Sequence, residues 1–280
     1  MTILEVKIIL NSKKIPYLFK SKQVGELYTI KTQNKMNQTT IDKMKTMKFY
    51  GMVRAFTTSL EDGRMATMTS DEMLSFLIDS EWDDRQDRKI QRYVRNARFR
   101  YNASIENLHF GPERNLEKNQ ILRFAECHFI AKAENLLITG CTGIGKSFIA
   151  SALGNQACQL GYKVYYMNIN KMFPKLKMMK ADGSYVREIT KIEKQDLLII
   201  DDFGLQSLDN QARLILMELI EDRHGKKSTI ITSQLPVNEW YDVIGEKTVA
   251  DAILDRLVHD AQRLELKGES MRRKKIRPIA

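Results

Sequence analysis

Residues 135–147, Asn-Leu-Leu-Ile-Thr-Gly-Cys-Thr-Gly-Ile-Gly-Lys-Ser, place a short apolar run directly before a glycine-rich loop. The loop meets every fixed position of the pattern G-x-x-x-x-G-K-[ST], at Gly140, Gly145, Lys146 and Ser147. The run before it has the composition of a buried parallel strand, and residues 148–157 repeat apolar side chains at helical spacing. The stretch therefore predicts a strand, a phosphate loop and a helix, which together indicate an α/β fold of the P-loop NTPase type.

Each fixed position of this loop has a physical task. Glycines leave backbone N–H groups free to line a concave nest for phosphate oxygens. The amine of Lys146 would reach the β- and γ-phosphates, the hydroxyl of Ser147 would ligate Mg²⁺, and the N-terminus of the following helix favours an anion. A glycine turn that binds nothing is the alternative, and the flanking strand and helix argue against it. We predict that ATP-type phosphates are bound by Gly140, Cys141, Thr142, Gly143, Ile144, Gly145, Lys146 and Ser147.

Two acidic residues end a second apolar strand, in the stretch Asp-Leu-Leu-Ile-Ile-Asp-Asp at residues 196–202. A strand buried on both faces would deliver Asp201 to its carboxyl edge, where the side chain can hold Mg²⁺ through water. Asp202 beside it could orient the attacking water. An apolar strand that merely ends in acids is common, but less so downstream of a phosphate loop. The two stretches together predict a nucleotide-hydrolysing site.

A third apolar strand, residues 228–234, ends in polar residues. Ligands of α/β sheets bind at the carboxyl ends of strands. Thr232, Ser233 or Gln234 would therefore lie between the strand that precedes the phosphate loop and the strand that ends in Asp201. One of these three side chains could sense the γ-phosphate there. Capping of the strand end is the alternative for each of them.

The composition of the 280-residue chain allows one large or two modest domains, since 43% of its residues are hydrophobic. No run approaches the length of a membrane span, and the N-terminus makes a poor signal peptide. Cys127, Cys141 and Cys158 are an odd number at unrelated spacings, which predicts a reducing compartment and no zinc site. We expect a cytoplasmic protein with no membrane partner.

The net charge of +10 is concentrated at the two ends of the chain. Residues 1–35 carry seven lysines against two acids, and residues 271–280 carry five basic residues against none. The body between them is formally neutral, so the charge predicts basic arms and local patches rather than a uniformly positive surface.

A basic helix is the main feature of the segment before the phosphate loop. Helical spacing of apolar residues predicts an all-α region, with an N-terminal capping signal at Thr69. In its last helix five basic residues fall on one face, and Tyr93 is interleaved with them. Such a face is typical of a surface that follows a phosphate backbone, although Asp83, Asp84 and Asp87 could instead neutralise it. The predicted DNA-binding residues are Arg85, Arg88, Lys89, Arg92 and Arg95.

A turn-rich connector containing Pro112 follows this helix and predicts a domain boundary. The expected organisation is a basic extension of uncertain order at 1–35, a helical DNA-binding domain at 36–112, and an ATPase domain with a basic C-terminal tail at 113–280.

Five motifs in this order resemble the IstB-like helper ATPases of insertion sequences: GCTGIGKS, LLIIDDFGL, STIITSQLPVNEW, DAILDRL and LKGESMRR. The resemblance runs from about Met36 to Arg273. These proteins are relatives of the DnaC helicase loader and of DnaA within the AAA+ class. The resemblance implies an ATP-dependent, double-stranded-DNA-binding homo-oligomer of bacterial cells, encoded beside a transposase that it assists in transposition.

The same resemblance assigns roles to residues outside the phosphate loop. It implies Asp201 and Asp202 as the Mg²⁺ and water residues, Ser233 as the first sensor, and Arg256 as an arginine finger that acts on a neighbouring subunit. An ion pair of Arg256 with Asp251 or Asp255 is the alternative for that residue. Two features depart from many AAA+ proteins: an aspartate stands at 202 in place of glutamate, and too few residues follow the final strand for a full helical lid. The role of Arg272 stays open.

A helicase loader is the competing hypothesis, since it would share the same ATPase core. A loader is expected to carry a partner-binding segment at its N-terminus, whereas the basic helix here favours DNA. The neighbouring gene would discriminate between the two, because a transposase favours the first hypothesis and a replication operon the second.

Overall fold

A computed structural model describes residues 35–271 of the chain. The predictions for the basic extension, for the tail from residue 272 onward and for Arg272 lie outside these residues. The chain divides into two compact units, Met1–Asp87 and Arg88–Ala280. Within the described residues no helix is both long enough and apolar enough to cross a membrane.

The first unit is helical, as predicted. Residues 35–46 form a helix, which is followed by α3 (Tyr50–Glu61), the short 3₁₀ turn η1 (Arg64–Ala66) and the first part of α4 (Ser70–Ala97). The capping signal at Thr69 is confirmed, because the Glu72 carboxylate accepts from the Thr69 backbone N–H at 2.8 Å and the Glu72 N–H donates to the Thr69 hydroxyl at 3.3 Å.

A buried carboxylate joins the two long helices of this unit. Glu81 of α4 accepts from the backbone N–H groups of Gly51 and Met52 at 2.8 and 3.3 Å, in the first turn of α3. The first N–H groups of a helix have no partner within the helix, so the carboxylate satisfies two of them and complements the helix dipole. A Cβ at Gly51 would lie 2.3 Å from the Ser80 carbonyl oxygen, so only glycine permits this approach of the helices.

The boundary between the units differs from the predicted one near residue 112. Helix α4 ends at Ala97, and the connector that follows contributes Ala103, Ile105 and Leu108 to the core of the second unit. Pro112 begins the 3₁₀ turn η3 (Pro112–Arg114). The connector has little regular structure, but its buried apolar side chains make it part of the second compact unit.

The second unit is built on a five-stranded parallel sheet with the order β2-β3-β4-β1-β5. Successive side chains of β3 point to opposite faces, since Leu197 and Ile199 belong to one apolar core and Leu198 and Ile200 to the other. The position predicted for the third apolar strand is confirmed, because β4 lies between β1 and β3. The strands are β1 (Leu136–Thr139), β2 (Val164–Asn168), β3 (Leu197–Phe203), β4 (Ser228–Ser233) and β5 (Gln262–Glu265).

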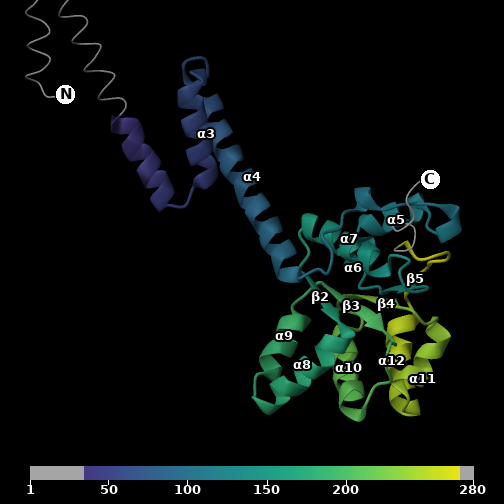
Figure 1. The fold of residues 1–280 in the computed structure, drawn as a ribbon. Helices are drawn as coiled ribbons and strands as arrows, with labels where there is room; N and C mark the ends of the chain where they lie inside the picture. Colours follow the sequence, from purple (N-terminus) through teal and green to yellow (C-terminus); the bar gives the residue numbers. More distant parts are fainter. Residues whose placement is uncertain (1–34, 272–280) are drawn as a thin grey trace, which may run out of the picture. The chain divides into compact units, whose positions relative to one another are not determined.

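Helices cover both faces of the sheet (Figure 1). One face carries α5 (Lys118–Ala125), α6 (His128–Ala131) and α7 (Lys146–Gln159). The other carries α8 (Ile169–Ala181), α9 (Tyr185–Glu193), α10 (Asn210–Arg223), α11 (Trp240–Ile244) and α12 (Lys247–Val258). Two more 3₁₀ turns, η2 (Ile105–Asn107) and η4 (Val237–Glu239), lie in the connections. This three-layer arrangement confirms the predicted fold and places the carboxyl ends of β1, β3 and β4 together.

Candidate functional site

The phosphate loop joins the carboxyl end of β1 to the first residue of α7. Gly145 is the N-cap of α7 and has a left-handed backbone. Gly140 approaches another segment closely, since a Cβ there would lie 2.5 Å from the Leu266 carbonyl oxygen. The Met271 N–H donates to the Gly143 carbonyl at 3.0 Å, and Met271 also lines the cavity beside the loop. The segment after β5 therefore supports the loop, while α7 directs its N-terminus into it.

Lys146 turns its side chain back over the loop. Its Nζ donates to the carbonyl oxygens of Gly140 and Cys141 at 2.6 and 2.9 Å. Burial lowers the pKa of Lys146, and the nearby Asp202 and Asp201 oppose that shift. The ammonium is thus held inside the loop by carbonyl oxygens rather than by carboxylates, and a phosphate oxygen could replace these weaker partners.

Asp201 is fully buried, and four side chains donate to it. Ser147 Oγ donates to Oδ1 at 2.7 Å, and Thr232 Oγ1 donates to the same oxygen. The Tyr166 hydroxyl and the Arg100 guanidinium donate to Oδ2. Burial and the hydrogen bond to Asp201 raise the pKa of Tyr166, so this hydroxyl keeps its proton. These donors satisfy the buried carboxyl group of Asp201.

The predicted magnesium residues lie side by side. Ser147 Oγ and Asp201 Oδ1 are 2.7 Å apart at the carboxyl end of the sheet, next to the phosphate loop. A hydroxyl and a carboxylate are the oxygen donors that Mg²⁺ takes from proteins that bind it together with phosphates. The residues present therefore fit the ion, and Ser147 and Asp201 are the ones that would hold it.

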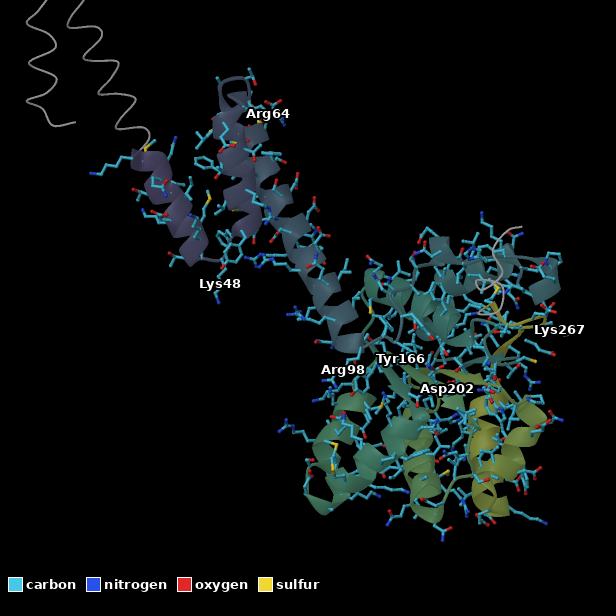
Figure 2. All side chains as sticks on the ribbon, viewed as in Figure 1. Lys48, Arg64, Arg98, Tyr166, Asp202 and Lys267 are labelled. Carbon is cyan, nitrogen blue, oxygen red and sulfur yellow. The ribbon has the colours of Figure 1, made fainter. Side chains whose placement is uncertain are left out.

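A β-bulge places Asp202 next to Asp201 at the site. The register of β3 against β4 shifts between Ile200 and Phe203, and Asp202 has a φ of +62°. Strict alternation along the strand would send the two carboxylates to opposite faces, whereas a bulge redirects one of them. Asp202 Oδ2 accepts from Asn168 Nδ2 at 2.7 Å and from Arg100 at 3.0 Å. Figure 2 labels Asp202 of β3 and Tyr166 of the neighbouring strand β2, whose hydroxyl donates to Asp201.

Arg100 bridges the two carboxylates, and the sequence analysis did not assign it to the site. Its Nη1 lies 3.2 Å from Asp201 Oδ2 and 3.0 Å from Asp202 Oδ2. Burial opposes the charge of Arg100, but Tyr101 and Asp201 outweigh it and raise its pKa. No local pattern marks this residue, because only the folded chain brings residue 100 next to residues 201 and 202.

A cavity of about 680 Å³ opens beside these residues. The phosphate loop and Asp202 line one part of it, and the connector residues Asn107, Leu108 and His109 line another. It has the size and the mixture of polar and apolar walls expected of a small-molecule site.

The structure assigns the end of β4 differently from the sequence analysis. Ser233 is fully buried, and its hydroxyl donates to the Phe203 carbonyl at 2.8 Å and accepts from the Leu235 N–H at 3.1 Å. It therefore caps the strand end and does not line the cavity. Gln234 does line it, and its side-chain oxygen accepts from the Thr142 hydroxyl. Of the three residues considered for the sensor, Gln234 is therefore the one that lines the cavity, and the Ser233 hydroxyl, implied as the sensor by the resemblance, is bonded within the strand end instead. The Thr232 hydroxyl donates to Asp201 and accepts from the Asp202 N–H at 3.1 Å.

Arg256 lies away from the phosphate loop of its own chain. Its Nε is 2.7 Å from Glu221 Oε2 of α10, and its Nη1 donates to the Ala252 carbonyl at 2.9 Å. The predicted alternative named Asp251 or Asp255 as its partner, and the structure shows Glu221 instead. Arg256 lines a separate cavity of about 720 Å³ together with His224 and His259.

The basic face of α4 is partly engaged within the chain. Arg85 pairs with Glu81 at 2.7 Å and lies 5.3 Å from the centre of the Phe49 ring. Lys89 and Arg92 lie 5.8 and 6.0 Å from the centre of the Tyr93 ring. Arg88 and Arg95 are exposed on the same helix.

Arg92 and Arg95 also line a cavity of about 810 Å³ in the second unit. Its other basic residues are Arg98, Lys163 and Lys191, and no acidic side chain lines it among the residues described. No motif in the sequence groups these three with the basic face of α4, because only the fold brings them next to it.

Comparisons with known proteins identify the family of the chain. Residues 42–278 match the family described as IstB-like ATP binding protein. The chain is 42% identical over 234 residues to an insertion sequence ATP-binding protein of Sinorhizobium fredii, covering 84% of this chain and 96% of that one. It is 37% identical over 202 residues to the ATP-binding protein of an insertion sequence from Pseudomonas fluorescens, covering 72% and 87%.

Solved structures show the same fold. The DnaC helicase loader matches with a TM-score of 0.52 and 21% identity, covering 63% of this chain and 99% of that one. DnaI matches with a TM-score of 0.53 and 20% identity, covering 63% and 94%. At such identities the likeness shows the fold and no more.

Proposed function

Because the chain belongs to the IstB-like ATP-binding proteins, we propose that it hydrolyses ATP and assists a transposase in moving an insertion sequence within the bacterial cytoplasm. The observation that carries the proposal is the convergence of Lys146, Ser147, Asp201 and Asp202 on one phosphate loop and cavity.

The residues of the site divide the chemistry among themselves. The loop N–H groups and the Lys146 ammonium bind the β- and γ-phosphates. Asp202 uses Oδ2 to accept from Asn168 and Arg100, so Oδ1 is the oxygen that orients the attacking water. Ser147 and Asp201 would hold Mg²⁺, which would neutralise charge on the phosphates. Gln234, which lines the cavity and accepts from the Thr142 hydroxyl, would sense the γ-phosphate.

The test of this function is ATP turnover by the purified full chain, measured with and without Mg²⁺ and with and without duplex DNA. We expect turnover that needs Mg²⁺ and changes when DNA is added. A protein that binds ATP and DNA but produces no ADP under any of these conditions would refute the hydrolytic part of the proposal.

A helicase-loading role has one observation in its favour, the fold shared with the DnaC helicase loader. The two roles differ in the partner. A pull-down with the transposase encoded beside this gene and with the host replicative helicase would separate them, and we expect the transposase to be retained.

DNA binding is the second part of the proposal. Arg88, Arg92 and Arg95 lie on one face of α4, and the last two line the basic cavity with Lys163 and Lys191. A surface of this charge suits the phosphate backbone of duplex DNA. Contacts to that backbone position a protein on the duplex without depending on the base sequence.

Replacing Arg88, Arg92 and Arg95 together by Ala is expected to weaken binding to unrelated duplexes by similar factors. Each lost phosphate contact changes the slope of log affinity against log salt by about 0.9, so three contacts should flatten it by roughly 2.7 per bound subunit. Fluorescence anisotropy at several salt concentrations measures this slope.

Two controls accompany the triple variant. Replacing Arg123, an exposed residue of α5, by Ala removes a charge elsewhere, and deleting residues 272–280 removes the basic tail. If the triple variant keeps the wild-type slope and the tail deletion loses it, α4 is not the DNA-binding surface.

Assembly is the third part, and it rests on Arg256. This side chain does not line the nucleotide cavity of its own chain, and it is 25% exposed beside Glu221. An arginine finger supplied by a neighbouring subunit would stabilise the charge that develops on the γ-phosphate.

Mixing Arg256→Ala subunits with Lys146→Ala subunits is expected to restore part of the ATP turnover that neither variant has alone, because each supplies the group that the other lacks. The measurement is turnover against mixing ratio, with subunit exchange verified by labelled chains. Mixtures that exchange subunits and remain inactive would show that Arg256 does not act across an interface.

A further inference from the structure

Arg114 is buried against the phosphate loop and is one of the residues that line the cavity beside it. It ends the turn η3, and only 6% of the residue is exposed. Its Nη2 donates to the Ile144 carbonyl at 2.6 Å, and its Nη1 donates to the His109 carbonyl. Its Nε is buried and has no hydrogen-bond partner within the described residues.

A second buried arginine shows what is unusual about Arg114. Arg223 is 2% exposed, and all three of its nitrogens donate, to the Thr229 hydroxyl and to backbone carbonyls that include those of Ile192 and Ser228. That network accounts for Arg223 as a structural residue. Arg114 keeps a charge out of water with fewer bonds and no ion pair to a carboxylate among residues 35–271. Burial lowers the pKa of Arg114, and Glu113 opposes this shift.

The bond to Ile144 determines how the next peptide is oriented. In a trans peptide the C=O and the following N–H point in opposite directions. A donor that fixes the direction of the Ile144 carbonyl therefore also fixes the direction of the Gly145 N–H, one of the loop N–H groups to which phosphate oxygens would bind. Polarisation through the peptide also makes that N–H a better donor.

Gly145 permits this contact. Its φ is +104°, and a Cβ on it would lie 3.0 Å from Arg114 Nη2. The glycine is thus needed both for the backbone conformation and for the approach of the guanidinium.

Arg114 also connects the segments around the loop. Through His109 it holds the connector that lines the nucleotide cavity, and its own carbonyl accepts from the Lys267 N–H at 3.0 Å. The side chain therefore lies where connector, phosphate loop and the segment after β5 meet.

We propose that Arg114 is a positioning residue for the nucleotide: it orients the Ile144–Gly145 peptide toward the phosphates, and the phosphates compensate its buried charge. The proposal rests on the nucleotide site proposed above. It assigns the effect of Arg114 to the phosphate chain rather than to the base.

The test compares Arg114→Met, Arg114→Lys and Arg223→Met in the full chain, by calorimetric titration with ADP and with inorganic pyrophosphate in the presence of Mg²⁺. Arg114→Met removes the charge and the donors, and it should lower the affinity for both ligands by a similar factor of about ten to a hundred. Arg114→Lys keeps the charge but loses the guanidinium that donates through two nitrogens. Its affinity for each ligand should lie between those of Arg114→Met and the wild type. Arg223→Met should lower the melting temperature of the ligand-free protein and leave both affinities near the wild-type values.

Three results would overturn the proposal. Unchanged affinities in folded Arg114→Met would remove any role in binding. A loss confined to ADP would assign Arg114 to the base through His109. Equal losses of affinity in Arg114→Met and Arg223→Met would mean that both residues act through the stability of the fold. If Arg114→Met does not fold, Arg114→Lys takes its place in each comparison. If wild type itself binds neither ligand, the nucleotide site fails instead, which is a separate outcome.

Discussion

ATP affinity is expected to fall by at least about a hundredfold when Lys146 is replaced by Ala. Hydrogen bonds to charged groups contribute about 1.5–3 kcal/mol each, and the ammonium would donate to phosphate oxygens in a partly buried loop. Within residues 35–271 the Lys146 ammonium donates to the Gly140 and Cys141 carbonyls and to no other group. Its loss should therefore affect the nucleotide far more than the fold. Titration with a fluorescent ATP analogue measures the change.

Lys227→Ala is the matched control for this variant. Lys227 is also a partly buried lysine of the second unit, and its Nζ pairs with Asp196 at 2.5 Å rather than lining the cavity. ATP affinity should stay at the wild-type value in Lys227→Ala, and the melting temperatures of the two variants should show that both fold. Equal ATP affinity in wild type and Lys146→Ala would refute the nucleotide site.

The parts of the site that depend on a local pattern could be predicted from the sequence. The phosphate loop is contiguous, so the glycines, Lys146 and Ser147 are marked by their spacing alone. Asp201 follows an apolar run, and parallel strands bring their carboxyl ends together, which is why its contact with Ser147 could be expected. The capping box at Thr69 was predictable for the same reason, since its two partners lie three residues apart.

The parts that depend on distant contacts could not be predicted. Arg100 and Tyr166 reach Asp201 from far along the chain, and Arg114 reaches the loop from a connector with little regular structure. The bulge in β3 changes which of its side chains face the site. At the end of β4 the Ser233 hydroxyl donates to the Phe203 carbonyl, while Gln234 lines the cavity. A shift of one residue at a strand end reverses the direction of a side chain, and residue types alone do not fix that shift.

ATP turnover, but not ATP binding, is expected to fall when Asp202 is replaced by Asn. The amide has the shape of the carboxylate, and its oxygen can still accept from Asn168 and Arg100. It loses the charge that orients and polarises the attacking water, a role that typically contributes about a hundredfold or more to a rate. Single-turnover hydrolysis should therefore slow by about that factor, while ATP affinity stays within a few-fold of wild type.

Asp201→Asn should behave differently, which makes it the comparison for Asp202→Asn. Asp201 accepts from Arg100, Ser147, Tyr166 and Thr232 in a fully buried position, so an amide N–H₂ group must face at least one of these donors. That conflict should lower the melting temperature and weaken the dependence of ATP affinity on Mg²⁺, neither of which is expected for Asp202→Asn. Wild-type turnover in Asp202→Asn would mean that another group orients the water. A parallel loss of ATP affinity and turnover in that variant would instead make Asp202 a binding residue. Asp201 and Asp202 would then both serve nucleotide binding, and neither would be assigned to the attacking water.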